Sequence, residues 1–209
     1  MVFDRFFGKK PAPTLPIIGD AGLGRAVRID PSMLRAVETA LGEPVSPDMV
    51  ITAHGVVEMP DDQGTVWLHR FYDDDHRMLQ AMTESAEGGP ALEWSFYVPA
   101  GSEHLAAGET VSAWKDRLSR PEFAHEGEPY ARLWYEGDDR EQPAVRFAEV
   151  VYEASDMTDG RTLVQDCMVY GRDTEQGELL LLAIVMGEGR EATLERMLGT
   201  GLRPHQVGV

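Results

Sequence analysis

The arrangement of strand-like segments along the chain constrains the fold most, because short turns join several of them. Segments rich in apolar, aromatic and β-branched residues occupy residues 49–59, 65–72, 77–83, 92–98, 130–135, 145–152, 162–170 and 179–186. Turn signals separate neighbouring segments at Asp61-Asp62-Gln63-Gly64, Gly137-Asp138-Asp139 and Gln176-Gly177. Antiparallel strands need only such a turn, whereas parallel neighbours need a long crossover. The sequence therefore predicts a mainly antiparallel sheet, in which the segments flanking each turn run in opposite directions.

Three helices are predicted beside this sheet. Asp30 and Pro31 mark a helix start, since Asp caps the first turn and Pro suits the first helical position, and Gly42 marks its end. Residues 110–118 and 191–198 also place apolar side chains on one helical face. We therefore expect an α+β fold: mainly antiparallel β-sheet with a few short helices. The sheet is expected to be one strongly curved sheet, such as a half-barrel, or two packed sheets.

Length, charge and cysteine content narrow the class of protein. The 209 residues are enough for one full core, and residues 19–209 are predicted to form a single α+β domain. The formal net charge of -17 repels nucleic-acid phosphates, which disfavours a DNA- or RNA-binding role. The one cysteine, Cys167, is typical of a reducing compartment, and the longest apolar run, 179–186, is far too short to span a bilayer as a helix. We expect a cytoplasmic protein, peripheral to the inner membrane at most.

The first 18 residues differ from the acidic body that follows. Residues 1–18 combine a basic, aromatic tip with a Pro-containing linker. The tip carries Phe3, Phe6, Phe7, Lys9 and Lys10. Burial of each aromatic side chain contributes about 1.5–3 kcal/mol, whereas each lysine near anionic lipid contributes about 1 kcal/mol. We therefore predict that the tip binds a protein partner or a membrane surface. The alternative is that it folds back on its own domain or stays disordered.

The densest group of potential metal ligands lies in one short stretch and comprises His69, Asp73, Asp75 and His76. A metal site needs two to four ligands that converge on one point, and a hairpin could bring these side chains together. The alternative is a solvated acidic turn beside an ordinary strand histidine. Because acidic turns are common and metal spacings are more regular, we favour the plain turn and predict no metal ligand and no cofactor.

Other candidate reactive groups have simpler explanations. Cys167 lies in a strand-like segment beside Asp166, which raises rather than lowers the pKa of a thiol. Ser102 and His104 lie two residues apart, but the Gly-x-Ser-x-Gly elbow of hydrolases is not present around them. The glycines near residue 20 are spaced Gly-x-x-Gly-x-Gly, which differs from the dinucleotide-binding fingerprint. The sequence therefore predicts no catalytic residue and favours a non-enzymatic protein over an enzyme.

Four short stretches, spread over nearly the whole chain, carry a resemblance to known proteins: Phe6-Phe7-Gly8-Lys9-Lys10, Leu68-His69-Arg70-Phe71-Tyr72-Asp73, Val150-Val151-Tyr152-Glu153 and Met168-Val169-Tyr170-Gly171-Arg172. Together they resemble the YjfK-like family of uncharacterised bacterial proteins. The resemblance implies a soluble cytoplasmic protein with no assigned activity and no catalytic residues to transfer. Members of that family are often encoded near relatives of the phage-shock membrane-stress protein, which implies a role near the envelope.

The leading functional hypothesis is a non-enzymatic binding or adaptor protein, linked to membrane or envelope stress and recruited through its tip. The second is a metal-assisted hydrolase that uses the group between His69 and His76. The third is a small-ligand-binding protein whose pocket is lined by strand aromatics, namely Trp67, Trp94, Trp134 and Tyr135, although such aromatics more often form a core. The ligand, the partner and the oligomeric state stay open.

Overall fold

The computed structural model of the chain describes residues 14–61, 64–104, 111–135, 140–188 and 191–208. Its strands are β1 (Ala26–Ile29), β2 (Asp48–Val50), β3 (Ala53–Asp61), β4 (Gly64–Tyr72), β5 (Met78–Thr83), β6 (Glu93–His104), β7 (Glu122–His125), β8 (Glu128–Arg132), β9 (Val145–Tyr152), β10 (Arg161–Thr174), β11 (Gly177–Glu188), β12 (Glu191–Leu202) and β13 (Val207–Gly208). Its helices are η1 (Pro31–Leu34), α1 (Arg35–Leu41), α2 (Val111–Leu118) and η2 (Pro204–Gln206). The strand pairings between these elements are antiparallel, so the prediction of a mainly antiparallel sheet with a few short helices is confirmed.

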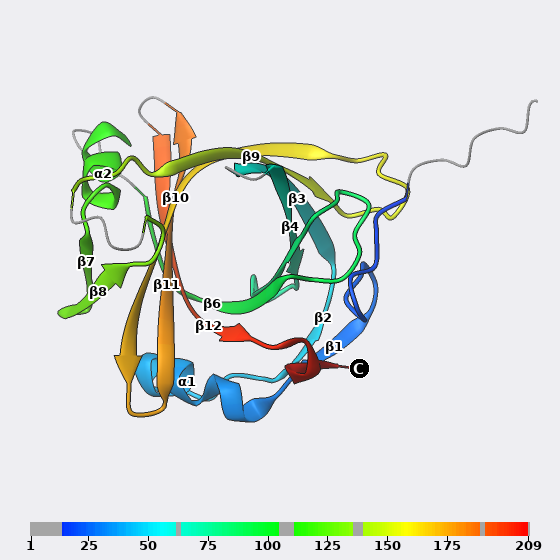
Figure 1. Ribbon diagram of the computed structural model, residues 1–209, viewed down its shortest axis with the longest axis horizontal. Coiled ribbons are helices and arrows are strands. Elements are labelled where there is room, and N and C mark those ends of the chain that lie inside the picture. Colours follow the sequence, from blue (N-terminus) through cyan, green and yellow to red (C-terminus); the bar gives the residue numbers. More distant parts are fainter. Residues whose placement is uncertain (1–13, 62–63, 105–110, 136–139, 189–190, 209) are drawn as a thin grey trace, which may run out of the picture.

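Eight strands close into a barrel in the order β11-β12-β6-β5-β4-β3-β9-β10, because β10 pairs again with β11. Figure 1 shows these strands surrounding the centre of the molecule. The stagger of the barrel can be followed from strand to strand through directly paired residues. Starting at Arg161 of β10 and going once around the barrel, the pairs lead back to β10 near Asp173. This stagger of about twelve residues tilts the strands steeply and widens the barrel, so long side chains are needed to fill it. The full closure goes beyond the predicted curved sheet or half-barrel.

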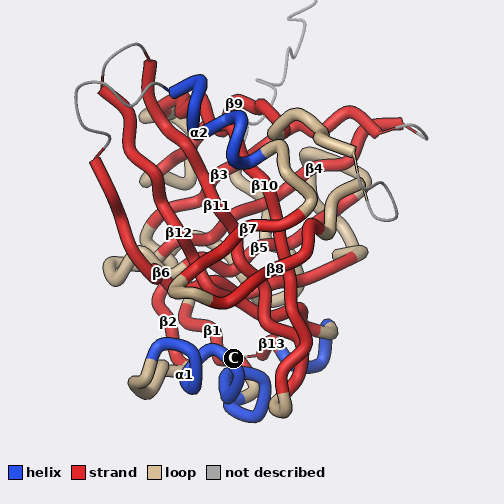
Figure 2. The backbone as a smooth tube through the Cα atoms, turned by 90° about the vertical axis from the view of Figure 1, so that its left-hand side faces the viewer, coloured by secondary structure: helices blue, strands red, loops and turns tan. Residues whose placement is uncertain are grey.

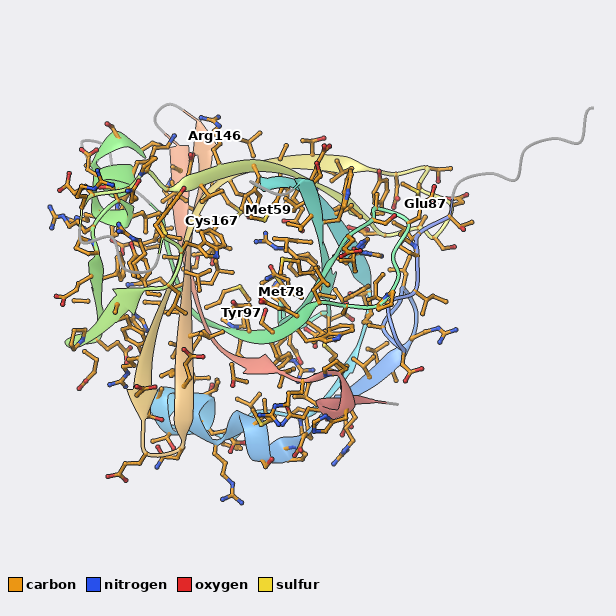
Figure 3. All side chains as sticks on the ribbon, in the orientation of Figure 1. Met59, Met78, Glu87, Tyr97, Arg146 and Cys167 are labelled. Atoms are coloured by element: carbon orange, nitrogen blue, oxygen red, sulfur yellow. The ribbon has the colours of Figure 1, made fainter. Side chains whose placement is uncertain are left out.

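The inward faces of the barrel strands form a core of their own. Its buried members are Val57, Leu68, Met78, Tyr97, Phe147, Cys167, Val169, Leu180, Leu182, Ile184 and Met197. Figure 3 shows Met59, Met78, Tyr97 and Cys167 inside the ring of strands. Met82 and Met186 pack against the same core, so five methionines line the interior. Methionine is flexible and fills irregular gaps, which suits the inside of a wide barrel.

A second, larger core lies between the barrel and the elements packed on its outside. Helix α1 contacts β11 and β12, α2 contacts β10 and β11, and the hairpin β7-β8 extends the sheet beyond β10. Figure 2 shows α2 and α1 near opposite ends of the barrel, with β7 and β8 across the same face. This covering explains the apolar run of β11, since Leu181 faces the outer core while Leu182 faces the inner one. Within the described residues, none of the helices has the length and apolarity required to cross a bilayer.

The predicted helix near residue 30 is confirmed, and its signals act as expected. The Asp30 side chain accepts a hydrogen bond from the Ser32 N–H over 2.9 Å at the start of η1. Gly42 ends α1 in the left-handed region with a φ of 73°, which glycine adopts without a Cβ clash. The helix predicted at residues 110–118 is also present, as α2. The hairpins β3-β4 and β10-β11 form around the predicted turns.

The predicted helix at residues 191–198 is wrong, because this segment is the first part of β12. Leu194 and Leu198 pack in the outer core, whereas Met197 packs inside the barrel. The pairing with β6 shifts register between Arg196 and Met197. The extra residue of this bulge is Ala100 of β6, and β12 itself alternates regularly. Because both faces of β12 bury apolar side chains, the residues at 194, 197 and 198 imitate one helical face.

The prediction that the segments around Gly137-Asp138-Asp139 run in opposite directions is also wrong. Strands β8 and β9 both pair antiparallel with β10, so they run in the same direction. They occupy successive lengths of that strand, since β9 pairs at residues 161–167 and β8 pairs at residues 170–171. The whole connection from Arg132 to Val145 therefore acts as a crossover, and the acidic turn signal is only a part of it.

Candidate functional site

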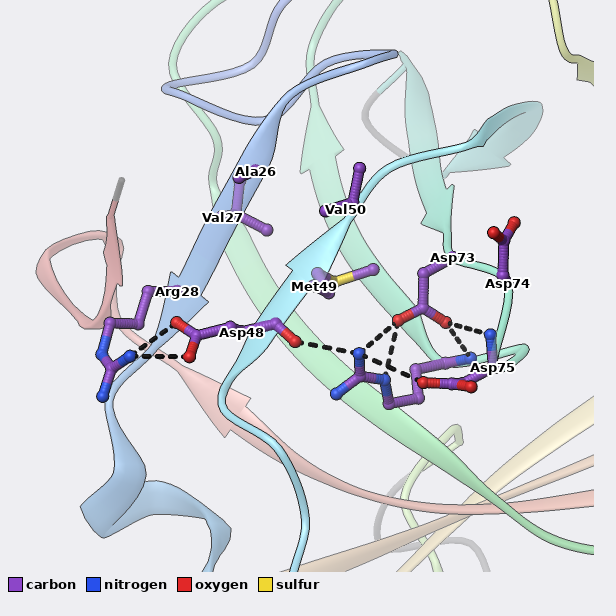
Figure 4. Close-up of a pocket in the computed structure, with 10 residues that line it drawn as sticks. Ala26, Val27, Arg28, Asp48, Met49, Val50, Asp73, Asp74 and Asp75 are labelled. Carbon is purple, nitrogen blue, oxygen red and sulfur yellow. Dashed lines mark hydrogen bonds and ion pairs between the residues drawn. The ribbon is translucent and has the colours of Figure 1, made fainter.

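A surface pocket of about 430 Å³ lies between the small sheet β13-β1-β2 and the turn that joins β4 to β5 (Figure 4). It is lined by Ala26, Val27, Arg28, Asp48, Met49, Val50, Asp73, Asp74, Asp75 and Arg77. Of its apolar residues, Val27 and Met49 are buried in the outer core, so the exposed apolar surface comes from Ala26 and Val50. Val50 is 56% exposed, which is unusual for a β-branched residue in a strand. An apolar surface with acidic sides therefore lies beside β2.

The strand β2 is an edge of the small sheet, since β1 separates it from β13. Met49 pairs with Val27 of β1, and the Ile51 N–H donates to the Arg25 C=O over 2.9 Å. Hydrogen bonds to one neighbour alternate along an antiparallel strand. Residues 47, 49 and 51 therefore bond toward β1, while residues 48, 50 and 52 direct their main-chain groups to the opposite side.

That opposite side faces the segment between β4 and β5. The Arg77 guanidinium donates to the Asp48 C=O over 2.9 Å, and the Thr52 N–H donates to the Tyr72 C=O over 2.8 Å. Between these two contacts, the N–H and C=O of Val50 have no backbone partner in the described part of the chain. One main-chain donor and one acceptor are thus open beside an exposed apolar side chain that lines the pocket.

The charged side chains of the pocket differ in how tightly they are held. Asp73 accepts from Arg77 Nε over 2.7 Å, and Arg77 also donates to the Ser46 C=O over 2.7 Å. Asp74 and Asp75 project from the turn, and the Asp75 side chain is 80% exposed at 3.7 Å from the guanidinium. Four aspartates against two arginines give the lining an excess of two negative charges. The pocket therefore favours a cationic group.

A second polar cluster lies inside the barrel, and its central members Arg70, Glu149 and Gln165 are buried. Arg70 of β4 donates to Glu149 of β9 over 3.0 Å and to Gln165 of β10 over 2.9 Å. Glu149 also accepts from the Tyr72 hydroxyl over 2.7 Å and from Gln165 Nε2 over 2.5 Å. Gln80 accepts from Arg70 Nε over 3.0 Å. The buried ion pair thus has hydrogen-bond partners from three strands, β4, β5 and β10, which is the condition under which such a pair is tolerated.

Burial and neighbouring charges shift the pKa values of Arg70, Tyr72 and Cys167 in this cluster. Burial lowers the pKa of the Arg70 guanidinium, but the adjacent Glu149 carboxylate contributes most to a net upward shift. Burial, and then Glu149, raise the pKa of the Tyr72 hydroxyl well above its ordinary value. Burial also raises the pKa of the Cys167 thiol to about 12. A thiol of this kind is inert at neutral pH, as the sequence predicted for Cys167.

A pair of buried histidines lies on the outer face of the same strands. His54 Nε2 lies 3.0 Å from His69 Nδ1, and His69 Nε2 lies 3.4 Å from the Ser85 C=O. Because a carbonyl only accepts, His69 carries its proton on Nε2 and accepts from His54 at Nδ1. Burial, and then His69, lower the pKa of His54 to about 3, so both rings are neutral at physiological pH. Their interaction joins β3 to β4 and fixes the outer core beside Phe71.

The structure does not bring together the four residues of the predicted metal group. His69 is buried against His54, and Asp73 is held by Arg77. Asp75 and His76 lie in the exposed turn, where His76 has a φ of 59°. Among the residues that the structure describes, no group of three or more His, Cys, Asp or Glu side chains is arranged to hold a metal ion. Residues 73–76 form a turn in which Asp73 is buried and residues 74–76 are exposed.

The remaining candidates of the sequence are also dispersed. The exposed Ser102 hydroxyl donates to Glu195 over 2.6 Å, and His104 lies at the exposed end of β6. Of the aromatics proposed to line one pocket, Trp94 packs in the outer core and Tyr135 is exposed, so they do not share a site. The predicted tip, Phe3 to Lys10, lies outside the described residues. Sequence reasoning missed the pocket and the Arg70 cluster, because both depend on partners far apart in the chain.

Comparison with known proteins places the chain in a family. A search of the curated proteins and a search of the solved structures each found no match to this chain. A family model described as "Protein of unknown function (DUF2491)" matches residues 2–208. This match spans nearly the whole sequence. The protein therefore belongs to the DUF2491 family, whose function is unknown.

Proposed function

We propose that this protein is a non-enzymatic adaptor that binds a partner at the pocket beside β2 and attaches to a membrane or membrane-bound partner through its tip. The pocket carries the proposal: it joins open main-chain groups, an exposed apolar side chain and exposed carboxylates. Such a combination is typical of recognition, in which apolar area supplies affinity and charge supplies specificity.

The fixed charges around the pocket support binding rather than chemistry. The carboxylate of Asp73 is held by the main-chain N–H groups of Asp75 and Arg77 as well as by the guanidinium of Arg77. These hydrogen bonds engage both oxygens of the carboxylate and fix the shape of the turn. The turn therefore presents Asp74 and Asp75 in a constant position.

The tip supplies the second half of the proposal. Phe3, Phe6 and Phe7 lie within ten residues of a chain end that also carries Lys9 and Lys10. Residues 1–13 hold one acidic and three basic side chains, in a protein whose net charge is -17. The resemblance to the YjfK-like family supports a membrane near the cell envelope as the surface to which this tip attaches, and a role in envelope stress.

Deletion of residues 1–10 tests the attachment. We expect the intact protein to co-sediment with liposomes that contain anionic lipid, and the truncated protein to stay in the supernatant, because the aromatic contribution dominates. A variant with Lys9→Gln and Lys10→Gln separates charge from apolar contact and should retain partial binding. Equal sedimentation of the intact and truncated proteins would remove the tip from the proposal.

A second candidate function is favoured by the barrel interior. Met59, Met82, Gln80 and Ser95 lie on inward-facing positions of β3, β5 and β6, yet they are only half-buried. Methionines at a partly open apolar surface adapt to ligands of different shape. A small apolar ligand that entered the barrel would change the fluorescence of a tryptophan introduced by Met82→Trp. Titration with a medium-chain fatty acid measures this change, and an unchanged spectrum would argue against the second function.

A further inference from the structure

We propose that the occupant of the pocket is an extended peptide segment of a partner protein that carries a lysine or arginine, and that one residue of this segment pairs with the main chain of Val50. This inference rests on the proposed function and specifies the chemistry of the partner. It follows from three features of the pocket, which are taken in turn.

The first feature is the hydrogen-bonding edge. Val50 directs its N–H and C=O away from β1, between the contact of Arg77 with Asp48 and the contact of Thr52 with Tyr72. An extended residue lying against this gap exchanges two main-chain hydrogen bonds with Val50, as in strand addition. Because both flanks of the gap are already bonded, the edge accepts one residue pair and not a long strand. A short, extended segment is therefore favoured over a second β-sheet.

The second feature is the apolar surface next to this edge. Val50 and Ala26 are exposed and supply the accessible apolar part of the lining, whereas Val27 and Met49 are buried beneath it. A volume of about 430 Å³ is within the range of small-molecule and peptide pockets. Side chains of a strand alternate between two faces, so the residue before or after the pairing residue places an apolar side chain on this surface.

The third feature is the charge of the turn. Asp73 is neutralised by Arg77, whereas Asp74 and Asp75 stand at the exposed side of the pocket. A cation that reaches them gains charge-assisted hydrogen bonds without breaking an existing strong pair. The same charge disfavours a second copy of this acidic protein as the occupant, since each copy carries a net charge of -17. A basic segment of another protein fits the pocket better.

The test uses the full chain, labelled with ¹⁵N, and two synthetic peptides. The probe is the acetylated and amidated peptide Thr-Val-Lys-Val-Thr, and its control replaces the lysine with glutamate. We expect the lysine peptide to shift the amide signals of Val50 and Asp74 in a saturable way, with about tenfold weaker binding of the glutamate peptide. Raising the salt concentration should reduce this difference, because the turn is exposed.

Two variants separate the edge from the charge. Val50→Pro removes the outward N–H but leaves the β1 ladder intact, whereas Val50→Thr keeps the donor and serves as the matched control. We expect Val50→Pro to abolish the saturable shifts at Asp74 and Val50→Thr to retain them. The double variant Asp74→Asn, Asp75→Asn should remove the preference for lysine over glutamate. Urea unfolding of each variant verifies that the fold is retained.

Two results would overturn the inference: the absence of a saturable shift with the lysine peptide at millimolar concentration, or equal binding by Val50→Pro and the unaltered protein. Sedimentation of Val50→Pro with liposomes reports separately on the adaptor function. If that variant still sediments while the peptide fails to bind, the tip attachment stands and only the peptide occupant is wrong. If the peptide binds but the truncated protein sediments with liposomes as the intact protein does, the peptide occupant stands and the tip attachment is wrong.

Discussion

The barrel interior and the surface pocket both contain arginine and carboxylate groups, but they use them in opposite ways. Inside the barrel, Arg70 and Glu149 are fully buried, and Tyr72, Gln80 and Gln165 hydrogen-bond to them. At the pocket, Arg77 holds Asp73 tightly, whereas Asp75 lies 3.7 Å from the guanidinium and stays largely in solvent. A sealed charge that lost its partner would be costly, so the first arrangement fits a structural role. A charge at the rim of the pocket stays hydrated and can contact a partner, so the arrangement at the pocket fits recognition.

Removal of Arg70 tests the structural role of the buried pair, where the largest effect is expected. Arg70→Met leaves Glu149 buried without its cation and should lower the free energy of unfolding by about 3–5 kcal/mol. Urea denaturation measures the loss. The double variant Arg70→Met, Glu149→Gln should recover part of it, because no uncompensated charge is left. If the single variant is as stable as the unaltered protein, the cluster is not the structural centre that we describe.

A substitution at Gly55 tests how tightly the barrel interior is packed. A Cβ at Gly55 would collide with the Glu149 carboxylate, so Gly55→Ala must displace the ion pair. We expect a loss of about 3 kcal/mol, the upper end of the range for overpacked cores. Gly201→Ala is the matched control, since a Cβ there meets nothing within 4 Å and its φ is not positive. Equal stabilities of the two variants would show that the interior yields to extra volume.

The histidine pair extends the comparison to pH. The ordinary pKa of 6.5 for His54 falls to about 3 in the native protein. Below pH 6.5, His54 is therefore protonated in the unfolded chain but stays neutral in the native protein. The free energy of unfolding consequently decreases as the pH falls. This residue contributes a slope of about 1.4 kcal/mol per pH unit, or about 2 kcal/mol by pH 5.

Urea unfolding between pH 7.5 and pH 5 checks this prediction. His54→Gln, which keeps a donor toward His69, should lose most of the slope that His54 contributes. His76 lies in the exposed turn, so His76→Gln serves as a control that should keep the slope. Identical slopes in all three proteins would mean that His54 titrates normally in the folded state.

The smallest effect is expected at the pocket rim. Arg28 and Asp48 form an ion pair at 2.6 Å, with more than half of each side chain exposed. Arg28→Ala should change the free energy of unfolding by about 1 kcal/mol or less, and high salt should erase the difference. Thermal unfolding at low and high salt measures both. A loss comparable to that of Arg70→Met would contradict the distinction between sealed and exposed charges.

Local elements of the fold were predictable because their signals are local. The Asp30 cap, the Gly42 stop and the turn at Gly177 lie within a few residues of the structure that they specify. The closure of the barrel has no such signal, since β3 pairs with β9 and β6 pairs with β12 across long stretches of sequence. A curved sheet follows from the turns, but a ring follows only from these distant pairings.

The candidate site was hard to predict for a related reason. Both faces of β4 are buried, so the sequence around Arg70 gives no sign of which face the arginine occupies. Its partner Glu149 is 79 residues away and is one of 36 acidic residues in the chain. The Asp73 turn was recognised as acidic and solvated, yet its role at the pocket depends on the edge of β2, which the sequence joined to β3 in one segment. Residue spacing alone could not show that β2 is a separate strand with its own edge beside this turn.

The long-range pairing of β6 with β12 also determines when the protein can complete its fold during synthesis. Strands β3 to β6 are consecutive hairpins and can form as soon as they leave the ribosome. Until β12 emerges, however, β6 keeps one open edge and the Met-rich inner surface has no opposite wall. A nascent chain with an open edge and exposed apolar residues is a substrate for chaperones and is prone to aggregate. Closure of the barrel is thus a late and slow step of folding. Until it is complete, the nascent chain depends on chaperones to stay soluble.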